Sequence, residues 1–405
     1  MPLIRPFAGL RPVAGRAEDV VAPPYDVLNS EEARSRAAGR PWSFLHISKA
    51  EIDLPEDTDP HAAEVYTRAA SNLQSMLQEG VLVRDPEPCY YVYRLVMGDH
   101  RQTGLVAAAS VAAYDGNRIR KHEFTRPEKE DDRVRQIEAL QAQTGPVLLA
   151  YESQSGVDAL LEAVTDRAPD VDLVADDGIG HTLWAVSEQS VIEQISRAFD
   201  AMPALYIADG HHRSAAASRV AASHGGSDAA SWFLTVNFPH RQMQILDYNR
   251  VVRDLSGMSA ETFLARVAER LDVVPVGDPV HPQGPGQFGM YLAGQWYRLA
   301  ARPESIPADP VGRLDVSVLA DQLLSPLLGI QDPRRDTRID FVGGIRGLEE
   351  LERRVDSGEM AVAFSMYATR MEDLMAVADA GEVMPPKSTW FEPKLADGLV
   401  SLVID

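Results

Sequence analysis

The sequence predicts an α+β protein, because strand-like and helix-like segments follow one another without regular alternation. Short apolar runs typical of buried strands, such as Tyr90 to Val96, stand beside segments whose apolar residues recur with helical spacing, such as Asp59 to Leu77. A doubly wound parallel sheet would instead repeat strand and helix in turn. The chain has 405 residues, of which 45% are hydrophobic and 24% charged, so it is long enough for two or three globular domains.

The elements expected up to residue 151 are separated by clear turn signals. Gly98-Asp99-His100 is a polar turn, and Asp115-Gly116 is a hairpin signal. A charged helix follows, and we expect it to turn Val134, Ile137 and Leu140 inward. In order, we expect a helix at 59–77, strands at 90–96 and 104–114, a hairpin return at 118–120, the charged helix at 128–144 and a strand at 146–151.

The elements expected after residue 151 continue the same mixture. Asp177-Gly178 marks the turn of a hairpin, and a Pro- and Gly-rich stretch marks a loop at 279–287. In order, we expect the hairpin at 173–186, a helix at 191–199, a strand at 205–208, a helix from 214, strands at 231–238 and 243–252 and a helix at 259–271. We divide the chain into three sections, at 1–104, 105–256 and 257–405.

The composition excludes several classes of function. A net charge of −21 repels nucleic acid and anionic membranes, so we expect neither as a partner, and any phosphate site must be a local basic pocket. We find no apolar run long enough to span a bilayer and no signal peptide at the start. The single cysteine, Cys89, rules out an intrachain disulfide and a cysteine zinc cluster, which suits a reducing cytoplasm.

The most informative stretch follows the strand expected at 205–208. Its order of apolar run, tight turn, cationic side chains and helix start is the order that an anion site requires. A glycine lets backbone N–H groups approach closely, and an arginine offers a planar fork to phosphate oxygens. The alternative is a solvated polar turn that happens to precede a helix. The residues concerned are Asp209, Gly210, His211, His212 and Arg213.

A second cluster of charges lies before the expected charged helix. Glu123 stands among cationic side chains that would keep it ionised and could gather anions. A carboxylate beside a phosphate site is the usual base for a substrate hydroxyl in phosphoryl transfer. The alternative is an exposed, salt-bridged loop. Thr125 and Pro127 would cap and begin the helix. The surrounding cations are Arg120, Lys121, His122 and Arg126.

Two further segments are candidates for binding the substrate. Tyr25 and Asp26 follow two prolines, so they are held rigidly and either line the same pocket or pack on the core. Near the end of the chain, Lys387 either holds a phosphate or a substrate carboxylate, or belongs to an ordered loop with Trp390 and Phe391. Its neighbours Ser388 and Thr389 share these two readings.

The two central motifs together resemble the ParB/sulfiredoxin-like fold, and within it the free-serine kinases. Those kinases carry a His-Glu pair before a helix, here His122-Glu123, and a strand ending in Asp-Gly-His-His-Arg, here 209–213. Over almost its whole length the chain is also similar to the bacterial family DUF1015, whose other marks match 22–27 and 384–389. The resemblance predicts a ParB/sulfiredoxin-like nucleotide-binding core at 105–256, elaborated by N- and C-terminal α/β sections.

The kinase resemblance implies a role for each motif. Glu123, with His122, would be catalytic, as the base on the acceptor hydroxyl. The loop from Asp209 to Arg213 would hold the phosphates of ATP or ADP together with Mg²⁺. The acceptor would be free L-serine or a related hydroxy amino acid. The stretch between the two motifs is longer here than in the compact kinases, so the acceptor pocket is expected to differ.

Several rival functions are weighed on the same residues. Sulfiredoxin chemistry needs a cysteine where this chain has His211, and ParB-type DNA binding needs a basic helical stretch that we do not find. Adjacent histidines such as His211-His212 rarely converge on one zinc ion, and we assign no metal ligand. A non-catalytic nucleotide sensor, a nucleotide hydrolase and an interaction protein remain alternatives. The donor nucleotide, the acceptor and the oligomeric state are left open.

Overall fold

A computed structural model describes residues 2–404 and confirms the α+β class. The chain forms two compact units. Unit 1 comprises residues 1–243 and 393–405, and unit 2 comprises residues 244–392. The sections expected at 1–104, 105–256 and 257–405 do not coincide with these units, and that division stays a prediction.

Unit 1 contains a nine-stranded sheet, two small two-stranded sheets and nine α-helices among its described residues. Its strands are β1 (Ile4–Arg5), β2 (Leu10–Pro12), β3 (Leu82–Arg84), β4 (Tyr90–Met97), β5 (His100–Ser110), β6 (Ile119–Arg120), β7 (Ala142–Gln143), β8 (Val147–Tyr151), β9 (Val171–Val174), β10 (Gly180–Val186), β11 (Leu205–Asp209), β12 (Trp232–Pro239) and β21 (Leu402–Val403). Its helices are α1 (Ala17–Val20), α2 (Ser30–Ala37), α3 (Leu45–Ser48), α4 (Ala63–Gln78), α5 (Val111–Asp115), α6 (Pro127–Leu140), α7 (Ser155–Val164), α8 (Gln189–Asp200) and α9 (His211–Ser223).

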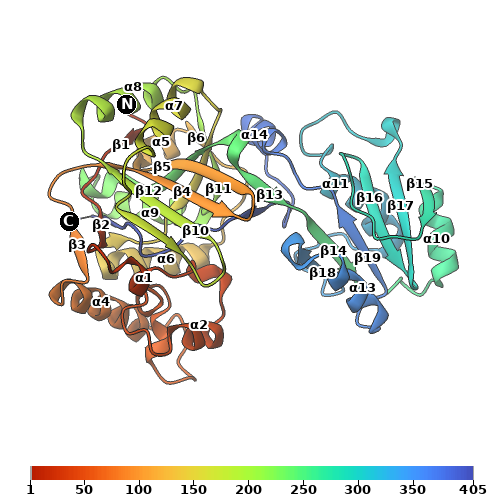
Figure 1. Cartoon of the computed structure of the whole chain (residues 1–405). Helices are drawn as coiled ribbons and strands as arrows, with labels where there is room; N and C mark the ends of the chain where they lie inside the picture. The colour runs from red at the N-terminus through yellow and green to blue at the C-terminus, as the bar shows by residue number, and fades with distance from the viewer. Residues whose placement is uncertain (1, 405) are drawn as a thin grey trace. The chain divides into compact units, whose positions relative to one another are not determined.

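The nine-stranded sheet is mixed. Its strand order is β6-β11-β8-β12-β5-β4-β10-β9, and β1 pairs with β5 beside this path. Only two pairs are parallel, β6 with β11 and β8 with β12. In Figure 1 the sheet lies between α7 and α8 on one side and α6, α4 and α2 on the other. The sheet therefore carries a helical layer on each face, which explains why β8 and the second half of β5 consist of buried, mostly apolar residues.

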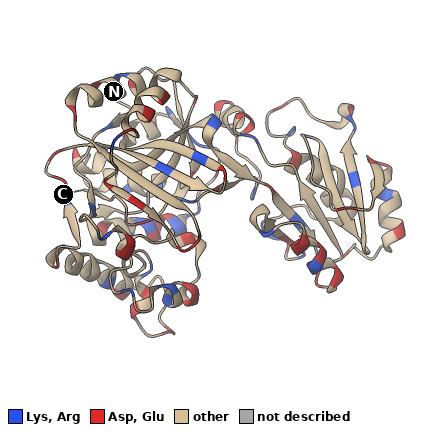
Figure 2. Ribbon diagram, viewed as in Figure 1, with Lys and Arg blue, Asp and Glu red and all other residues tan. Residues whose placement is uncertain are grey.

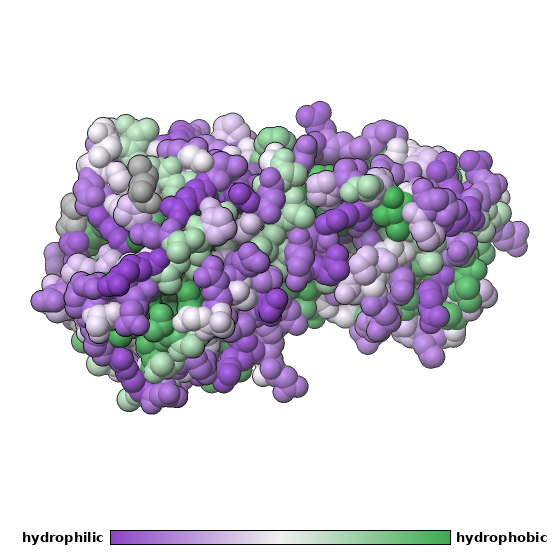
Figure 3. All heavy atoms as spheres, turned by 90° about the horizontal axis from the view of Figure 1, so that it is seen from above, coloured by the Kyte–Doolittle hydropathy of each residue, from purple (hydrophilic) through white to green (hydrophobic). Residues whose placement is uncertain are grey.

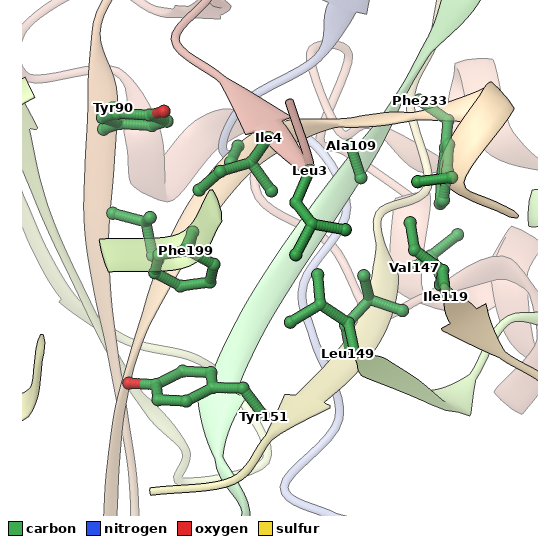
Figure 4. Close-up of a cluster of buried hydrophobic side chains, with 14 of the residues drawn as sticks. Leu3, Ile4, Tyr90, Ala109, Ile119, Val147, Leu149, Tyr151, Phe199 and Phe233 are labelled. Atoms are coloured by element: carbon green, nitrogen blue, oxygen red, sulfur yellow. The ribbon is translucent and has the colours of Figure 1, made fainter. Parts of the chain in front are cut away.

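The main core of unit 1 lies between the sheet and the helices α7, α8 and α9 (Figure 4). Tyr151 and Phe199 meet there edge to face, with ring centroids 5.3 Å apart. Leu3 and Ile4, at the start of β1, are also fully buried, so this segment is tied into the core. A second cluster joins α2, α3 and α4 to the end of α6 through Leu140. Because burial of each such side chain is worth about 1.5–3 kcal/mol, the two clusters fix the unit's architecture.

Unit 2 is built around a six-stranded antiparallel sheet of order β15-β17-β16-β19-β14-β18. Its strands are β13 (Gln244–Leu246), β14 (Tyr248–Val252), β15 (Leu271–Val276), β16 (Gln287–Leu292), β17 (Gln295–Ala301), β18 (Ile339–Gly343), β19 (Val362–Met366) and β20 (Trp390–Glu392). Its helices are α10 (Ala260–Ala268), α11 (Asp315–Leu319), α12 (Ser325–Leu328), α13 (Glu349–Asp356) and α14 (Met371–Asp379). Leu351 of α13 packs on Val251 and Ala363 of the sheet.

Several expected boundaries are wrong, each for a local reason. The strand expected to run to Tyr114 ends at Ser110, whose side chain accepts a hydrogen bond from the Ala113 N–H and starts α5. The hairpin expected at 115–116 does not form, because β6 pairs in parallel with β11 instead. The charged helix ends at Leu140, since Gln141 adopts a left-handed conformation with φ 49°.

Other boundaries shift by a few residues. The helix expected at 59–77 begins at Ala63, and the strand expected at 243–252 is divided into β13 and β14. The helix expected from Ser214 begins three residues earlier, at His211, so the cationic residues form its first turn rather than a loop before it. The expected hairpin at 173–186 and the strand at 146–151 are confirmed, with small changes at their ends.

The surface carries both signs of charge. Figure 2 shows acidic and basic residues interspersed along the helices. The face seen in Figure 3 is mostly hydrophilic, with scattered hydrophobic residues. Within residues 2–404, none of the helices has both the length and the apolar character needed to cross a bilayer.

Gly104 provides a test of the packing in the middle of the sheet. A Cβ at this position would lie 2.6 Å from the Asn237 carbonyl oxygen and from the Phe238 ring. We expect Gly104→Ala to lower the free energy of unfolding by about 1–3 kcal/mol, because a packed core resists added volume. Denaturant unfolding of the full chain measures this change. The control is Gly156→Ala in α7, where a Cβ meets nothing within 4 Å; equal losses in both variants would contradict the packing argument.

Candidate functional site

The two predicted motifs meet because the strands before them are parallel neighbours. Ile119 and Arg120 of β6 pair with Leu205 and Tyr206 of β11. Both strands therefore end at the same edge of the sheet, and the segments that follow them leave side by side. In α/β sheets this edge, outside the carboxyl ends of parallel strands, is the usual place for a ligand. Residues 121–126 and 209–213, far apart in the sequence, thus form one cluster.

The loop after β11 is shaped by a glycine. Gly210 has φ 100°, and a Cβ there would lie 3.1–3.3 Å from the Arg213 guanidinium and the Val147 Cα. Such a positive φ and such close packing both favour glycine. Gly210 is the N-cap of α9, and no side chain caps this helix start. The first N–H groups of α9, with the positive end of its dipole, are thereby directed at the cluster.

Arg213 is the largely buried cation of the loop, with 11% of its side chain exposed. Its guanidinium donates a short hydrogen bond to the Pro146 carbonyl and lies 3.7 Å from the Asp209 carboxylate and 3.8 Å from that of Asp26. Burial alone would lower the pKa of Arg213, but the two carboxylates outweigh burial and raise the pKa above its usual value. The positive charge is therefore permanent and held in one place.

Asp209 is paired on its other side with Lys394. The Lys394 Nζ lies 3.4 Å from Asp209 Oδ2. Burial opposes ionisation of this carboxyl, yet the charges of Lys394 and Arg213 hold its pKa well below the usual range. Lys394 was not among the residues predicted from the sequence, although it follows the aromatic pair of the 384–394 segment by a few residues. It adds a second cation beside the loop.

His211, His122 and Glu123 form a chain of contacts. The backbone N–H of His122 donates to His211 Nε2 at 3.4 Å. In a neutral His211 ring the proton is therefore on the other ring nitrogen, Nδ1. That nitrogen lies 3.7 Å from Glu123 Oε2, and the Glu123 side chain is 58% exposed. The two imidazole rings meet edge to face at 4.5 Å. Burial, together with His122, lowers the pKa of His211 well below its usual value, so the ring stays neutral.

His122 is itself buried. Burial lowers the pKa of its imidazole to about 4, and its Nδ1 has no hydrogen-bond partner among the described residues. A ring in this position supports His211 and is shielded from any ligand in solvent. A catalytic role for His122 therefore stays a prediction. Its contacts favour a role in positioning His211.

The start of α6 lies against the same loop. The backbone N–H of Arg126 donates to His212 Nε2 at 3.1 Å, which leaves the His212 Nδ1 proton available to a ligand. Pro127 is the first residue of α6, as expected, but the N-cap is Arg126 and its side chain makes no cap bond. The expected cap, Thr125, instead donates to Glu130. Two helix starts without side-chain caps thus adjoin at His212.

Tyr25 and Asp26 reach this cluster from the N-terminal section. Asp26 contacts Arg213, and the Arg133 guanidinium lies over the Tyr25 ring at 4.0 Å. A small cavity of about 30 Å³ adjoins Arg213, and Tyr25, Arg133 and Asp397 contribute polar groups to its lining. Asp397 Oδ1 is buried there without a partner among the described residues. The structure therefore brings Tyr25, Asp26, Glu123 and the loop of 209–213 together.

The remaining candidates lie in unit 2. Lys387 has φ 58°, its carbonyl accepts from Arg250 at 2.8 Å, and its Nζ lies 5.5 Å from the centre of the Tyr248 ring. Ser388 donates to the Pro385 carbonyl at 2.6 Å. These local contacts fit an ordered loop. A role in substrate binding for Lys387, Ser388 and Thr389 stays a prediction.

Two of the cations expected around Glu123 have other neighbours. The Lys121 Nζ lies 3.9 Å from the centre of the Tyr114 ring, and the Arg120 guanidinium lies 5.7 Å from that of Tyr206. Within residues 2–404, no three His, Cys, Asp or Glu side chains gather in a way that could hold a metal ion. Cys89 is buried, and burial raises the pKa of its thiol.

Comparisons with known proteins find a family and several solved structures. A family model described as "Protein of unknown function (DUF1015)" matches residues 4–317. A free serine kinase in complex with AMP is 15% identical, with a TM-score of 0.35, covering 73% of this chain and 92% of that one. SbnI with C-terminal truncation from Staphylococcus aureus is 12% identical, with a TM-score of 0.38, covering 72% and 85%. A conserved hypothetical protein from Pyrococcus furiosus is 15% identical, with a TM-score of 0.35, covering 72% and 93%. The comparison with curated proteins finds no match.

Asp397 gives this cluster a pH dependence. Burial raises the pKa of Asp397 to about 7, although the charge of Arg213 opposes this shift. The folded chain therefore keeps a proton that the unfolded chain loses near pH 4, and this contribution to stability disappears as the pH rises from about 4 to about 7. We expect Asp397→Asn, which keeps an acceptor for the Tyr25 N–H, to remove this fall.

The measurement is the free energy of unfolding of both proteins between pH 4 and pH 8. The difference between variant and wild type should move in the variant's favour up to about pH 7 and then level off. A difference that does not change with pH would show that Asp397 is ionised throughout.

Proposed function

Because the chain belongs to the DUF1015 family, whose description assigns no activity, we propose its function from the site: it transfers a phosphoryl group from ATP or ADP to the hydroxyl of a small molecule. The observation that carries this proposal is the contact of Glu123 with His211 in the first turn of α9. It puts a solvent-accessible carboxylate beside a helix start that has no side-chain cap. That pair of features is what transfer to an alcohol requires.

The phosphate half of the site rests on the loop of 209–213. The N–H groups at the start of α9, the Arg213 fork and the ring N–H of the neutral His212 offer several donors to phosphate oxygens. The second uncapped helix start, at Arg126, lies against His212 and extends the same surface. A polyphosphate chain would be positioned by fixed donors, which lowers the reorganisation needed during transfer.

Mg²⁺ would enter with the nucleotide. In nucleotide sites this ion is usually held by phosphates, waters and only one or two carboxylates. Asp209, which is ionised and lies within the loop, is the carboxylate that fits this part. Bound there, the ion would neutralise charge on the transferring group.

The acceptor half rests on Glu123. Its carboxylate would take the proton from the acceptor hydroxyl while the hydroxyl oxygen forms its bond to the terminal phosphorus. The bond from that phosphorus to the bridging oxygen breaks, and the nucleotide leaves with one phosphate fewer. His211, whose Nδ1–H faces Glu123, would orient the carboxylate, and buried His122 would hold His211.

The free-serine kinases, which the two motifs resemble, suggest the acceptor. We propose free L-serine or a related hydroxy amino acid, and a cytoplasmic setting in which the nucleotide is available. Tyr25 and Asp26, which border the loop through Arg213, are further residues that we propose to contact the substrate. Phosphorus NMR of the chain with Mg²⁺, nucleotide and a panel of hydroxy amino acids tests the proposal. Nucleotide hydrolysis without a phosphorylated acceptor would contradict it.

Replacing the proposed base separates transfer from binding. We expect Glu123→Gln to lower the transfer rate about 10²–10⁴-fold, because a positioned base contributes that much. The dissociation constant for AMP, measured by calorimetry, should change little. Glu138→Gln is the matched control, since Glu138 is an exposed acid in the last turn of α6, away from the start of that helix. Equal rates for Glu123→Gln and wild type would remove Glu123 from the reaction.

Replacing the buried guanidinium tests the phosphate half. Arg213→Lys keeps the charge but loses the planar fork that meets both the Pro146 carbonyl and a phosphate. We expect nucleotide affinity to fall about tenfold or more, which corresponds to about 1.4 kcal/mol. Arg219→Lys, on the exposed face of the same helix, is the control. Unchanged affinity in Arg213→Lys would place the phosphates elsewhere.

A further inference from the structure

A second, larger cavity adjoins the loop on the side of Lys394. Its volume is about 240 Å³, far above the ~10–15 Å³ that one water molecule needs. It is walled by the proline-rich segment of Pro23 and Pro24, by the β9–β10 hairpin and by residues 394–396, all within unit 1. The cavity therefore combines the N-terminal section, the hairpin and the returning C-terminal segment of unit 1.

The wall of this cavity carries both signs of charge. Arg36, Arg40 and Lys394 line it, and so do Glu18, Asp176 and Asp177. Arg40 is paired with Asp176 at 2.8 Å, and Lys394 with Asp209 at 3.4 Å. Asp177 Oδ1 accepts from the Ile179 N–H. Cationic and acidic groups around one small cavity, two of them paired with each other, suit a ligand that itself carries both an ammonium and a carboxylate group.

His181, a buried residue of the cavity wall, is held as a neutral hydrogen-bond donor. The Ala396 N–H donates to the Tyr93 hydroxyl at 3.4 Å, so the hydroxyl proton is directed to His181 Nδ1 at 2.7 Å. The Nε2 of His181 then carries the ring proton. Burial lowers the pKa of His181 to about 4, and the ring stays neutral. His181 therefore adds a polar group of fixed character to the charged wall.

The order of contacts along the loop separates this cavity from the proposed phosphate surface. Asp209, at the start of the loop, meets Lys394 of the cavity wall. His212, three residues further along, meets the start of α6. Glu123 contacts His211, which lies between Asp209 and His212 in the sequence. A ligand in the cavity would thus lie on the Asp209 side of His211, and a polyphosphate at the two helix starts would lie on its His212 side.

We propose that this cavity is the acceptor subsite and that it takes a zwitterionic hydroxy amino acid of the size of serine or longer. The inference rests on the proposed phosphoryl transfer and names its substrate class. The lining residues include no Phe, Tyr or Trp on which a nucleobase would stack, and they carry six charged side chains. Lys394 would hold the carboxylate near the loop, and Asp177 would face the ammonium group.

A substitution at the mouth of the cavity tests the inference without disturbing the core. Val174 lines the cavity, lies on the edge strand β9 and is 73% exposed. Val174→Trp should fill part of the cavity and leave the fold intact. The control is Val83→Trp on β3, which is also exposed and does not line this cavity. Arg36→Gln, which removes an exposed cation from the wall, is a second variant.

The readouts are the dissociation constants for AMP, L-serine and L-homoserine, measured by calorimetry, and the KM for each amino acid in phosphoryl transfer. We expect Val174→Trp and Arg36→Gln to weaken binding of the two amino acids about tenfold or more. The dissociation constant for AMP should stay within about twofold of the wild-type value. N-acetyl-L-serine amide, which lacks both charges, should bind wild type at least tenfold more weakly than L-serine.

The outcomes distinguish this inference from the proposed function. Transfer to L-serine with the same KM in Val174→Trp as in wild type would overturn the cavity assignment and leave the kinase proposal standing. Amino acid binding that is lost in Val174→Trp, in a protein that transfers no phosphate, would support the subsite and overturn the kinase. Weaker AMP binding in Val174→Trp would assign the cavity to the nucleoside and overturn the acceptor assignment. A wild-type protein that binds neither amino acid would also overturn that assignment.

Discussion

The burial of Arg213 is the constraint on which the site depends. A guanidinium withdrawn from water is stable only if carbonyl and carboxylate oxygens replace its hydration. Here the Pro146 carbonyl, Asp209 and Asp26 supply these oxygens, and they come from the start of β8, the end of β11 and the N-terminal section. The requirement of one cation thus joins three distant parts of unit 1. It also holds a permanent positive charge beside the start of α9.

The parallel pairing of β6 with β11 is the second constraint, and it decides what the charge can act upon. Because the two strands end together, Glu123 meets the first turn of α9 although it is far away in the sequence. The histidines between them are neutral, since burial outweighs the acids around them. Neutral rings donate and accept in fixed directions without adding charge, so the site keeps the carboxylate and the guanidinium as its main charges.

Much of this arrangement could be predicted from the sequence, because its signals are local. The apolar run before Asp209, the glycine at the turn and the proline at the start of α6 are each read from a few neighbouring residues. The pairing partner of β6 could not be predicted from the sequence. Asp115-Gly116 has the pattern of a hairpin turn, although it ends α5 in the structure. Lys394 and Asp397 were missed for the same reason: a lone charge has no periodicity, and its importance comes from a contact across nearly 200 residues.

Unit 1 is discontinuous, and this has a consequence for biosynthesis. The chain leaves the unit after residue 243, forms unit 2 and returns at residue 393 to supply Lys394, Asp397 and the strand β21, which pairs with β7. During translation the loop of 209–213 is therefore made long before the residues that complete its surroundings. A nascent chain would carry the Arg213 site with part of its wall missing until residues 393–404 leave the ribosome. The order of synthesis thus delays the assembly of the site until unit 2 has been made.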